Sequence, residues 1–364
     1  MLLSLCFALL LHAQEPMTIK LLPPGPGNPR NSEGDFVKLK DRRWLLIYSK
    51  FTSHGPADSG AAMLAARYSS DEGRTWTTDD RIIVENEAGM NVMSVSLLRL
   101  KSGEIALFYA RKNSMQDCRP YLRISKDEGK TWSAPRLTIP DTGYYVLNNS
   151  RVVQLKSGRL LLPVAYHHNE TLDPRQFNGR GVAMTYISDD KGKSWRRSKT
   201  KLEHPDPANR TGLQEPGLVL LKDGRLLMFI RTSMGTQYYS YSSDNGDTWT
   251  PVEASTLQSP VSPASIKRIP KTGDLLVVWN DHANVPEAIR GKLRTPMTVA
   301  ISKDEGKTWQ KAKNLMDDPA GWYCYTAIAF AGERVLLTYV ATGAGQDKLS
   351  QTVITHFGLD WLYR

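Results

Sequence analysis

Ser125-Lys-Asp-Glu-Gly-Lys-Thr-Trp132 is one of five copies of an eight-residue pattern in this chain. In every copy Ser, Asp, Gly, Thr or Ser, and Trp hold fixed places, while the positions between them vary. The copies are 69–76, 125–132, 188–195, 242–249 and 302–309, and their starts lie 56, 63, 54 and 60 residues apart. This period is too long for a helical hairpin and predicts a repeated unit of several β-strands.

A second repeat, an apolar hairpin, precedes each of these turns and adds a sixth unit. The six hairpins begin at Leu39, Leu100, Leu155, Leu221, Ile269 and Phe330. Short β-rich runs joined by glycine-containing turns are typical of antiparallel hairpins. We therefore predict an all-β fold, a six-bladed β-propeller of four-stranded antiparallel blades. The sixth unit lacks the eight-residue pattern, so we expect the two chain ends to complete it, with residues 351–361 supplying a last strand.

The pattern S-x-D-x-G-x-T-W resembles the Asp-box of sialidases and related β-propellers, and the resemblance covers nearly the whole chain. We expect each Asp-box to be the turn between the third and fourth strands of a blade, at the blade periphery. Its Asp and Ser side chains can bond backbone N–H groups of the turn, its Gly can take a positive φ, and its Trp can pack on the sheet. The boxes are therefore predicted to be structural, with neither a catalytic nor a calcium-binding role.

One domain, 17–364, accounts for all the repeats. Residues 1–13 form a short apolar stretch that ends in a small residue, although no Lys or Arg precedes it. This stretch resembles a secretory signal cut after Ala13 and predicts a secreted or periplasmic protein. No later run is long enough to span a membrane. We expect a monomer, and either two free thiols or one bridge at Cys118 and Cys324.

The net charge of +10, from 47 basic and 37 acidic residues, is scattered along the chain. No basic helix or RNA-binding signature appears, so nucleic acid is not an expected partner. A positive field would instead attract an acidic glycan or glycoconjugate. No motif indicates a cofactor, and His167-His168 has no further ligands in view that would make a metal site.

Polar residues cluster where the innermost strands of the blades should begin. Counting six positions back from the start of each hairpin gives Glu33, Ser94, Asn149, Glu215, Pro263 and Cys324. Their neighbours add Arg30, Asp35, Arg151, Tyr323 and Tyr325. Buried polar groups need one another or a ligand. The sequence is consistent with a hydrogen-bonded channel wall or a ligand pocket, and we favour the pocket.

The resemblance to sialidases implies roles for several of these residues. Sialidases hold the substrate carboxylate with three arginines, and here Arg30, Arg231 and Arg294 resemble them. The nucleophile resembles Tyr325, with Tyr323 on the same strand face as an alternative, and Glu215 would act as its base. Asp58, on the loop 53–60, resembles the acid/base residue. Planar guanidinium groups suit a carboxylate because each can donate two parallel hydrogen bonds.

The chain also departs from the family pattern. Pro29-Arg30-Asn31-Ser32 stands where Arg-Ile-Pro is usual, and Glu33 or Asp35 could pair with Arg30. Asn149 and Arg151 add polar groups at the third blade. The sequence thus predicts a secreted exo-glycosidase that hydrolyses terminal sialic acid, or a related acidic sugar, with retention through a Tyr nucleophile. The alternatives are a non-catalytic glycan-binding propeller and a glycosidase or lyase for a different acidic sugar.

Overall fold

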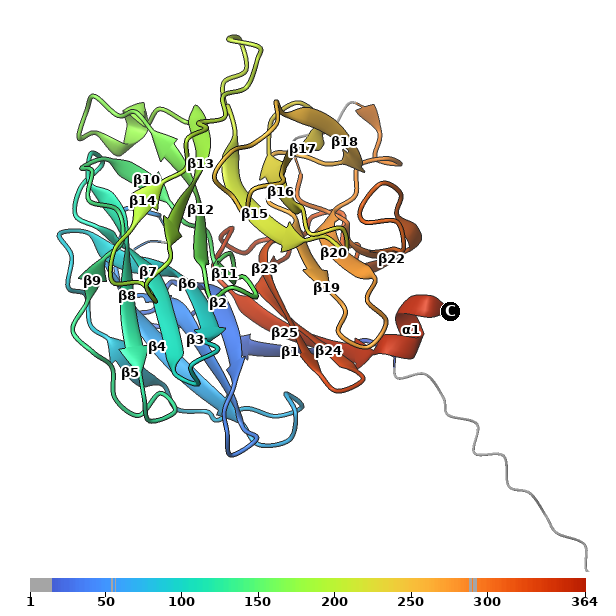
Figure 1. Cartoon of the computed structure of the whole chain (residues 1–364). Helices are drawn as coiled ribbons and strands as arrows, with labels where there is room; N and C mark the ends of the chain where they lie inside the picture. The colour runs from blue at the N-terminus through green and yellow to red at the C-terminus, as the bar shows by residue number, and fades with distance from the viewer. Residues whose placement is uncertain (1–14, 54, 56, 288–289, 291–292) are drawn as a thin grey trace, which may run out of the picture.

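The computed structural model describes residues 15–53, 55, 57–287, 290 and 293–364, and these form a six-bladed β-propeller (Figure 1). The all-β prediction and the blade architecture are confirmed. The expected signal segment, 1–13, lies outside the described residues. Within the described part of the chain, no helix has the length and apolar character needed to cross a membrane.

Three blades are four-stranded antiparallel sheets whose strands follow chain order from the inside outward. The first blade contains β2 (Arg30–Lys38), β3 (Trp44–Phe51), β4 (Ala62–Ser69) and β5 (Arg81–Val84). The fourth contains β15 (Gln214–Leu220), β16 (Leu226–Arg231), β17 (Thr236–Ser242) and β18 (Glu253–Gln258). The fifth contains β19 (Ser265–Arg268), β20 (Leu275–Asn280), β21 (Met297–Ser302) and β22 (Gln310–Met316).

The second and third blades are joined into one nine-stranded sheet. The second blade contains β6 (Asn91–Arg99), β7 (Ile105–Lys112), β8 (Cys118–Ser125) and β9 (Arg136–Leu137). The third contains β11 (Val153–Gln154), β12 (Leu160–His167), β13 (Gly181–Ser188) and β14 (Arg196–Arg197). The link is β10 (Tyr144–Val146), which pairs parallel to β8 and antiparallel to β12. The repeats did not predict this link.

The two chain ends close the ring in the sixth blade, as predicted. This sheet runs from β23 (Trp322–Ala331) through β24 (Arg334–Thr342) and β25 (Thr352–Gly358) to β1 (Met17–Leu22). The strand β1 pairs antiparallel with β25 and lies beside it in Figure 1. Of residues 351–361, only Thr352–Gly358 is strand, because Leu359–Tyr363 forms the short helix α1, which buries Leu359, Trp361 and Leu362.

The Asp-boxes form the predicted turns between the third and fourth strands. In the second box, Asp127 Oδ1 accepts hydrogen bonds from Ser125 Oγ at 2.9 Å and from the Thr131 N–H at 2.8 Å. Ser125 Oγ in turn accepts one from the Gly129 N–H at 2.8 Å, and Gly129 has a φ of 79°. These hydrogen bonds all lie within the turn, so the Asp127 carboxylate stabilises the backbone of its own box.

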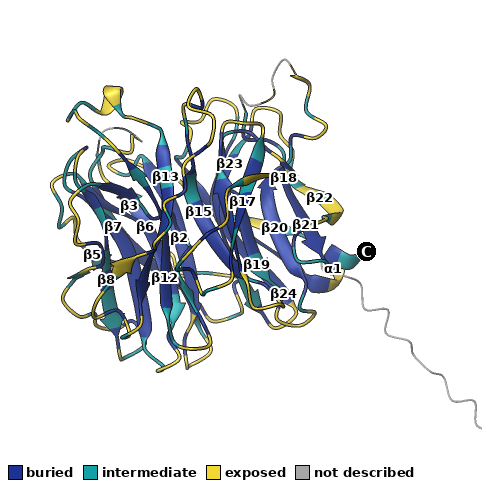
Figure 2. Ribbon diagram, turned by 45° about the horizontal axis from the view of Figure 1, so that its top comes forward, coloured by how far each residue is buried: buried dark blue, intermediate teal, exposed yellow. Residues whose placement is uncertain are grey.

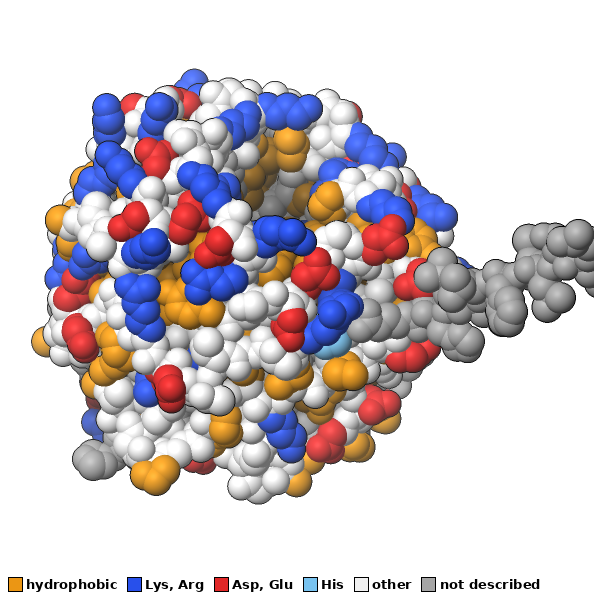
Figure 3. Space-filling model, turned by 90° about the horizontal axis from the view of Figure 1, so that it is seen from below, with side chains coloured by type: hydrophobic (Ala, Val, Ile, Leu, Met, Phe, Trp, Pro, Cys, Tyr) orange, Lys and Arg blue, Asp and Glu red, His pale blue; other side chains and the backbone are white. Residues whose placement is uncertain are grey.

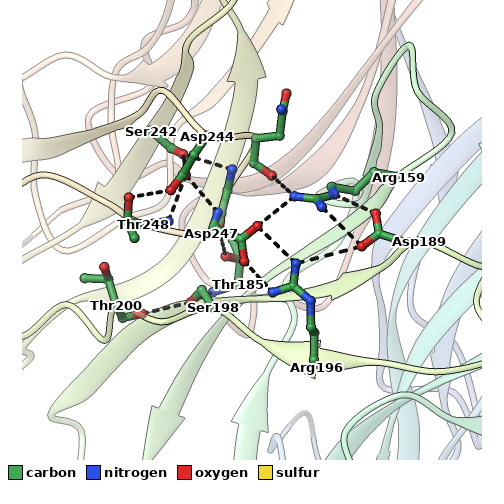
Figure 4. A network of polar contacts seen from close by, with 12 residues as sticks. Arg159, Thr185, Asp189, Arg196, Ser198, Thr200, Ser242, Asp244, Asp247 and Thr248 are labelled. Carbon is green, nitrogen blue, oxygen red and sulfur yellow. Dashed lines mark hydrogen bonds and ion pairs between the residues drawn. The ribbon is translucent and has the colours of Figure 1, made fainter.

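Ion pairs next to the boxes hold neighbouring blades together. Figure 4 shows Asp247, in the fourth box, between Arg159 and Arg196 of the third blade. Arg159 also contacts Asp189 of the third box, with 2.7 Å between its Nε and the carboxylate. A network of several charges stabilises more than an isolated surface pair does.

The hydrophobic core lies between adjacent sheets. One cluster packs Leu45 and Ile47 of β3 against Leu97 of β6 and Leu107 of β7. Figure 2 shows buried strands with exposed residues mostly in the loops. The blades therefore support each other face to face and leave the starts of their innermost strands free to form a site at the central channel.

Candidate active site

The innermost strands of four blades carry a β-bulge near their start. The pairing register shifts at corresponding places in β2, β6, β15 and β23. The bulged residues with positive φ are Glu33 (54°), Ser94 (60°), Glu215 (47°) and Tyr325 (59°). Such a backbone conformation costs a non-glycine residue about 1–3 kcal/mol, so the surrounding sheet must hold it in place. Bulges redirect side chains, and here all four turn toward one cavity.

This cavity, which we call the upper cavity, has a volume of about 280 Å³. The volume lies near the lower end of the usual range for small-ligand pockets, roughly 300–1,000 Å³. Its charged and phenolic lining consists of Glu33, Asp58, Lys112, Glu215, Arg231, Arg294, Tyr144 and Tyr325. Apolar side chains such as Met93, Val146 and Phe177 form the rest of the wall.

Arg30 is fully buried directly behind this wall. Its Nη2 lies 2.9 Å from Glu33 Oε1, and its Nη1 contacts Asp58 Oδ1. The guanidinium also lies over the ring of Phe51, 4.3 Å from the ring centroid. Of the two carboxylates expected near Arg30, Glu33 therefore pairs with it, whereas Asp35 bonds elsewhere.

Arg231 and Arg294 both line the upper cavity, from the fourth and fifth blades. Arg231 Nη1 lies 2.8 Å from Glu215 Oε2. The Arg294 guanidinium lies over the rings of Trp322 and Tyr325, at 4.8 and 5.7 Å from their centroids. Its Nε and Nη1 are buried and have no hydrogen-bond partner among the described residues. Buried donors of this kind call for an acceptor that a ligand can supply.

The charges around the upper cavity do not cancel. Four cations, Arg30, Lys112, Arg231 and Arg294, face three carboxylates, Glu33, Asp58 and Glu215. In formal terms one positive charge remains, which an anionic ligand with a single charge would balance. A small site with low-dielectric walls strengthens this attraction.

Tyr325 is buried beside charged groups of both signs. Burial raises the pKa of its phenol, the nearby Glu215 carboxylate raises that pKa further, and Arg294 partly opposes the shift. The phenol is therefore neutral at physiological pH. It can lose its proton only to a base that acts as the oxygen forms a new bond.

Asp58 lies on the loop between β3 and β4, and its side chain is 58% exposed. Its backbone oxygen accepts hydrogen bonds from Lys112 Nζ and Asn91 Nδ2, both at 2.8 Å. Desolvation favours a higher pKa for the Asp58 carboxyl, but the charges of Arg30 and Lys112 outweigh it and hold the pKa at about 2. In the unliganded protein this side chain is thus a carboxylate.

Besides Arg30, four of the candidate site residues selected from the sequence do not line the upper cavity. Tyr323 packs in the hydrophobic cluster between the fifth and sixth blades, and its N–H donates to the Arg294 backbone oxygen at 3.0 Å. Asn149 Nδ2 crosses the channel to the backbone oxygens of Gly34 and Tyr325, at 2.9 and 3.0 Å. Asp35 and Arg151 line a second cavity, further along the innermost strands, which we call the lower cavity.

Lys112 and Tyr144 also line the upper cavity, as does His167, but no site role was derived for them from the sequence. A usable signal exists, because Lys112 and His167 each stand twelve residues after the first residue of their hairpin, Leu100 or Leu155. Burial lowers the pKa of His167 to about 4, so the ring is neutral at pH 7. Its Nδ1 lies 3.1 Å from the Asn178 backbone oxygen.

No group of three or more His, Cys, Asp or Glu side chains that could hold a metal ion occurs in the described residues. Cys118 and Cys324 are both buried and unbridged, which answers the question left open by the sequence.

The fold and the upper cavity define a propeller of the sialidase type with a charged site at the channel mouth. Residues 55–337 match the model of the BNR repeat-like domain, and the chain belongs to that family. A sialidase of Bacteroides fragilis is 26% identical over 228 residues, which are 59% of this chain and 38% of that protein. This chain therefore covers well under half of that relative.

Solved structures share the fold at low sequence identity. A protein of unknown function from Dyadobacter fermentans has a TM-score of 0.73 at 18% identity, covering 94% of this chain and 99% of that one. The Hadza microbial sialidase Hz136 has a TM-score of 0.73 at 19% identity, with 94% and 69% covered. The NanB sialidase of Streptococcus pneumoniae has a TM-score of 0.72 at 14% identity, with 94% and 70% covered.

Proposed function

We propose that this protein is a secreted or periplasmic exo-glycosidase of sialidase type, which hydrolyses a terminal acidic sugar with retention of configuration. One observation carries the proposal: Arg231 and Arg294 line, from two blades, one cavity that also contains Tyr325 and Glu215, and Arg30 of a third blade lies directly behind its wall, paired with the lining residues Glu33 and Asp58. The sialidase relatives support the reaction class. The apolar residues 1–13 support the location.

The arginines would bind the sugar carboxylate. Arg294 offers the buried Nε and Nη1 donors, and Arg231 lines the same cavity. Each hydrogen bond to a charged group contributes about 1.5–3 kcal/mol. Arg30 is held by Glu33 and Asp58 in the unliganded protein, so a bound carboxylate would compete with Asp58 for it.

Tyr325 is the proposed nucleophile. A carboxylate next to the anomeric carbon would repel an Asp or Glu nucleophile by about 4 kcal/mol at 4 Å and an effective dielectric constant of 20. A neutral phenol avoids this repulsion. As the Tyr325 oxygen bonds to the anomeric carbon, its proton passes to Glu215, and the glycosidic bond breaks. Water then attacks from the face that the leaving group has vacated, opposite Tyr325. The bond to Tyr325 breaks, and the phenol regains its proton from Glu215.

Asp58 is the proposed acid and base. To protonate the leaving oxygen, its pKa must rise from the value of about 2 in the unliganded protein. Loss of the Arg30 contact to the substrate carboxylate would produce such a rise, because Arg30 is the leading charge that holds the pKa down. Asp58 then returns to the carboxylate form and accepts a proton from the attacking water.

A glycosidase or lyase for a different acidic sugar is the second candidate. Glu33 favours it, because its carboxylate lines the upper cavity between Arg30 and Ser94 and can accept a sugar hydroxyl. A sugar whose hydroxyl groups are arranged differently from those of sialic acid could donate a hydrogen bond to the Glu33 carboxylate equally well.

The test is turnover of fluorogenic sialosides and of a panel of acidic glycans by the wild type and by Asp58→Ala, Tyr325→Phe and the matched control Tyr323→Phe. Sialoside turnover that disappears in Asp58→Ala and Tyr325→Phe supports the proposal. Activity restricted to another acidic glycan supports the second candidate. Glycan binding without any turnover would replace both with a binding function.

A further inference from the structure

The lower cavity lies at the far end of the same channel. Its lining comes from later positions of the innermost strands, such as Leu97 in β6 and Leu218 in β15, whereas Ser94 and Glu215 of these strands line the upper cavity. Its volume is about 200 Å³. Most of its wall is apolar, so the charged groups that line it need partners of opposite charge or hydrogen-bond acceptors.

Arg151 is the most deeply buried of the basic groups, with 4% of its surface exposed. Its guanidinium donates to the Ala264 backbone oxygen at 2.8 Å and to Ser265 Oγ at 3.3 Å, and it lies over the ring of Phe229. Both acceptors are neutral. The Nε is buried and has no hydrogen-bond partner in the described part of the chain. Leaving such a charged donor unsatisfied is costly.

Lys267 brings a second cation to the lower cavity. Its Nζ donates to the Ile328 backbone oxygen at 2.7 Å and to Ser150 Oγ at 3.4 Å, which again are neutral acceptors. An ammonium group has three donors, so one remains for a further partner.

Asp35 is the one carboxylate among the described lining residues, and its oxygens are already used. Oδ1 accepts the Phe36 N–H at 2.9 Å, and Oδ2 accepts the Leu97 N–H at 2.8 Å. The third basic lining residue, Arg268, pairs with Glu305 at 2.6 Å. Arg151 and Lys267 against Asp35 therefore leave one formal positive charge in a small, mostly apolar space.

We propose that the lower cavity binds a small anion with a single charge, a halide or a small carboxylate, held by the Arg151 Nε–H and the Lys267 ammonium. Such an anion would neutralise the excess charge and accept the hydrogen bond for which Arg151 Nε has no partner among the described residues. The cavity has little room for a sugar. On the face seen in Figure 3, lysine and arginine side chains stand around a hollow, so an approaching anion meets a favourable field.

The site is independent of the proposed enzymatic activity, and its test uses no substrate. The Tm of the wild type is measured while sodium bromide or sodium formate is added, with Lys267→Gln and Arg151→Met beside it. Lys307→Gln is the matched control, because it removes the same charge from an exposed position in the fifth Asp-box. Binding to the folded state should raise the wild-type Tm by about 2 °C or more at saturation.

The proposal predicts that this rise persists in Lys307→Gln and is lost in Lys267→Gln. A response to formate alone would identify a carboxylate site, and a response to bromide alone a halide site. Because Arg151→Met could fail to fold, crystals grown with bromide give a second measurement through anomalous scattering. A bromide peak in contact with Arg151 Nε and Lys267 Nζ supports the site. No peak there, or an equal rise in Tm in all variants, overturns it.

Discussion

The two ends of the central channel have the same formal charge excess but different side-chain chemistry. Each cavity contains a buried arginine with N–H donors that have no hydrogen-bond partner among the described residues: Nε and Nη1 of Arg294 at the upper end, and Nε of Arg151 at the lower end. The upper cavity adds two phenols and three carboxylates, and three of these five groups are on bulged residues. The lower cavity has one carboxylate, which is committed to backbone N–H groups. Excess charge alone explains anion binding, whereas a reaction also needs groups that can attack and transfer protons.

The largest expected effect distinguishes the two tyrosines of β23. Tyr325→Phe removes the proposed nucleophile and should lower kcat by at least about 10³-fold. Tyr323→Phe removes a hydroxyl outside the upper cavity and should leave kcat within a few-fold. Steady-state kinetics on the best substrate checks both. Equal losses in the two variants would contradict the assignment to Tyr325.

Removing Arg294 tests the carboxylate clamp. Arg294→Met eliminates donors that a bound carboxylate would use, worth about 1.5–3 kcal/mol per hydrogen bond, so KM should rise about 10- to 100-fold. The substrate's uncharged methyl ester should lose this sensitivity, because it lacks the anionic partner. The exposed Lys307→Met serves as the charge control. A KM unchanged in Arg294→Met would rule out a clamp that includes this residue.

Asn149 of the third blade connects the innermost strands of the first and sixth blades through its side-chain amide. Its replacement should mainly lower the stability of the fold. Asn149→Ala removes two buried hydrogen bonds, to the Gly34 and Tyr325 backbone oxygens, and should lower the free energy of unfolding by roughly 1–3 kcal/mol. Urea denaturation measures this loss. If stability is unchanged, the amide does not tie the bulges together.

The smallest expected effect is a pH dependence that arises from Asp58. Its folded-state pKa of about 2 is below the ordinary value of 3.8, so its ion pair stabilises the protein above pH 4 and is lost as the pH falls toward 2. The difference in unfolding free energy between wild type and Asp58→Asn should therefore be largest above pH 4 and shrink below it. Denaturation curves from pH 2 to pH 6 check the sign. A difference that grows on acidification contradicts it.

Repetition made the blades predictable from the sequence, because each Asp-box and hairpin fixes a turn through local chemistry. The strand β10 and the helix α1 occur once, so no repeat pointed to them. Counting six residues back found Glu33, Ser94 and Glu215 at the bulges. In the third and sixth blades it gave Asn149 and Cys324, one residue short of Ser150 and Tyr325, which have the positive φ.

The prediction of the site from the sequence was limited because counting back from each hairpin reaches only the innermost strand of a blade. The resemblance to sialidases, and not the counting, selected Arg30, Arg231, Arg294 and Asp58. Three of them line the upper cavity and Arg30 lies behind its wall, and their roles remain predictions. Lys112 and His167 were missed because each is the last residue of the second strand of its blade. Arg151 and Asp35 line the lower cavity instead of the upper one. How far along the channel a side chain lies depends on how the blades are arranged around the axis, and a local sequence pattern does not contain that information.

The pairing of β1 with β25 has a consequence for biosynthesis. Thr18 faces Thr355, so the hydrogen bonds that seal the ring join segments more than 300 positions apart. A ribosome releases the first of these segments long before the second exists, and until the two pair, the strands already made present open edges on which other chains can add. Closure is thus necessarily a late event, and nascent copies should be most prone to aggregate just before it.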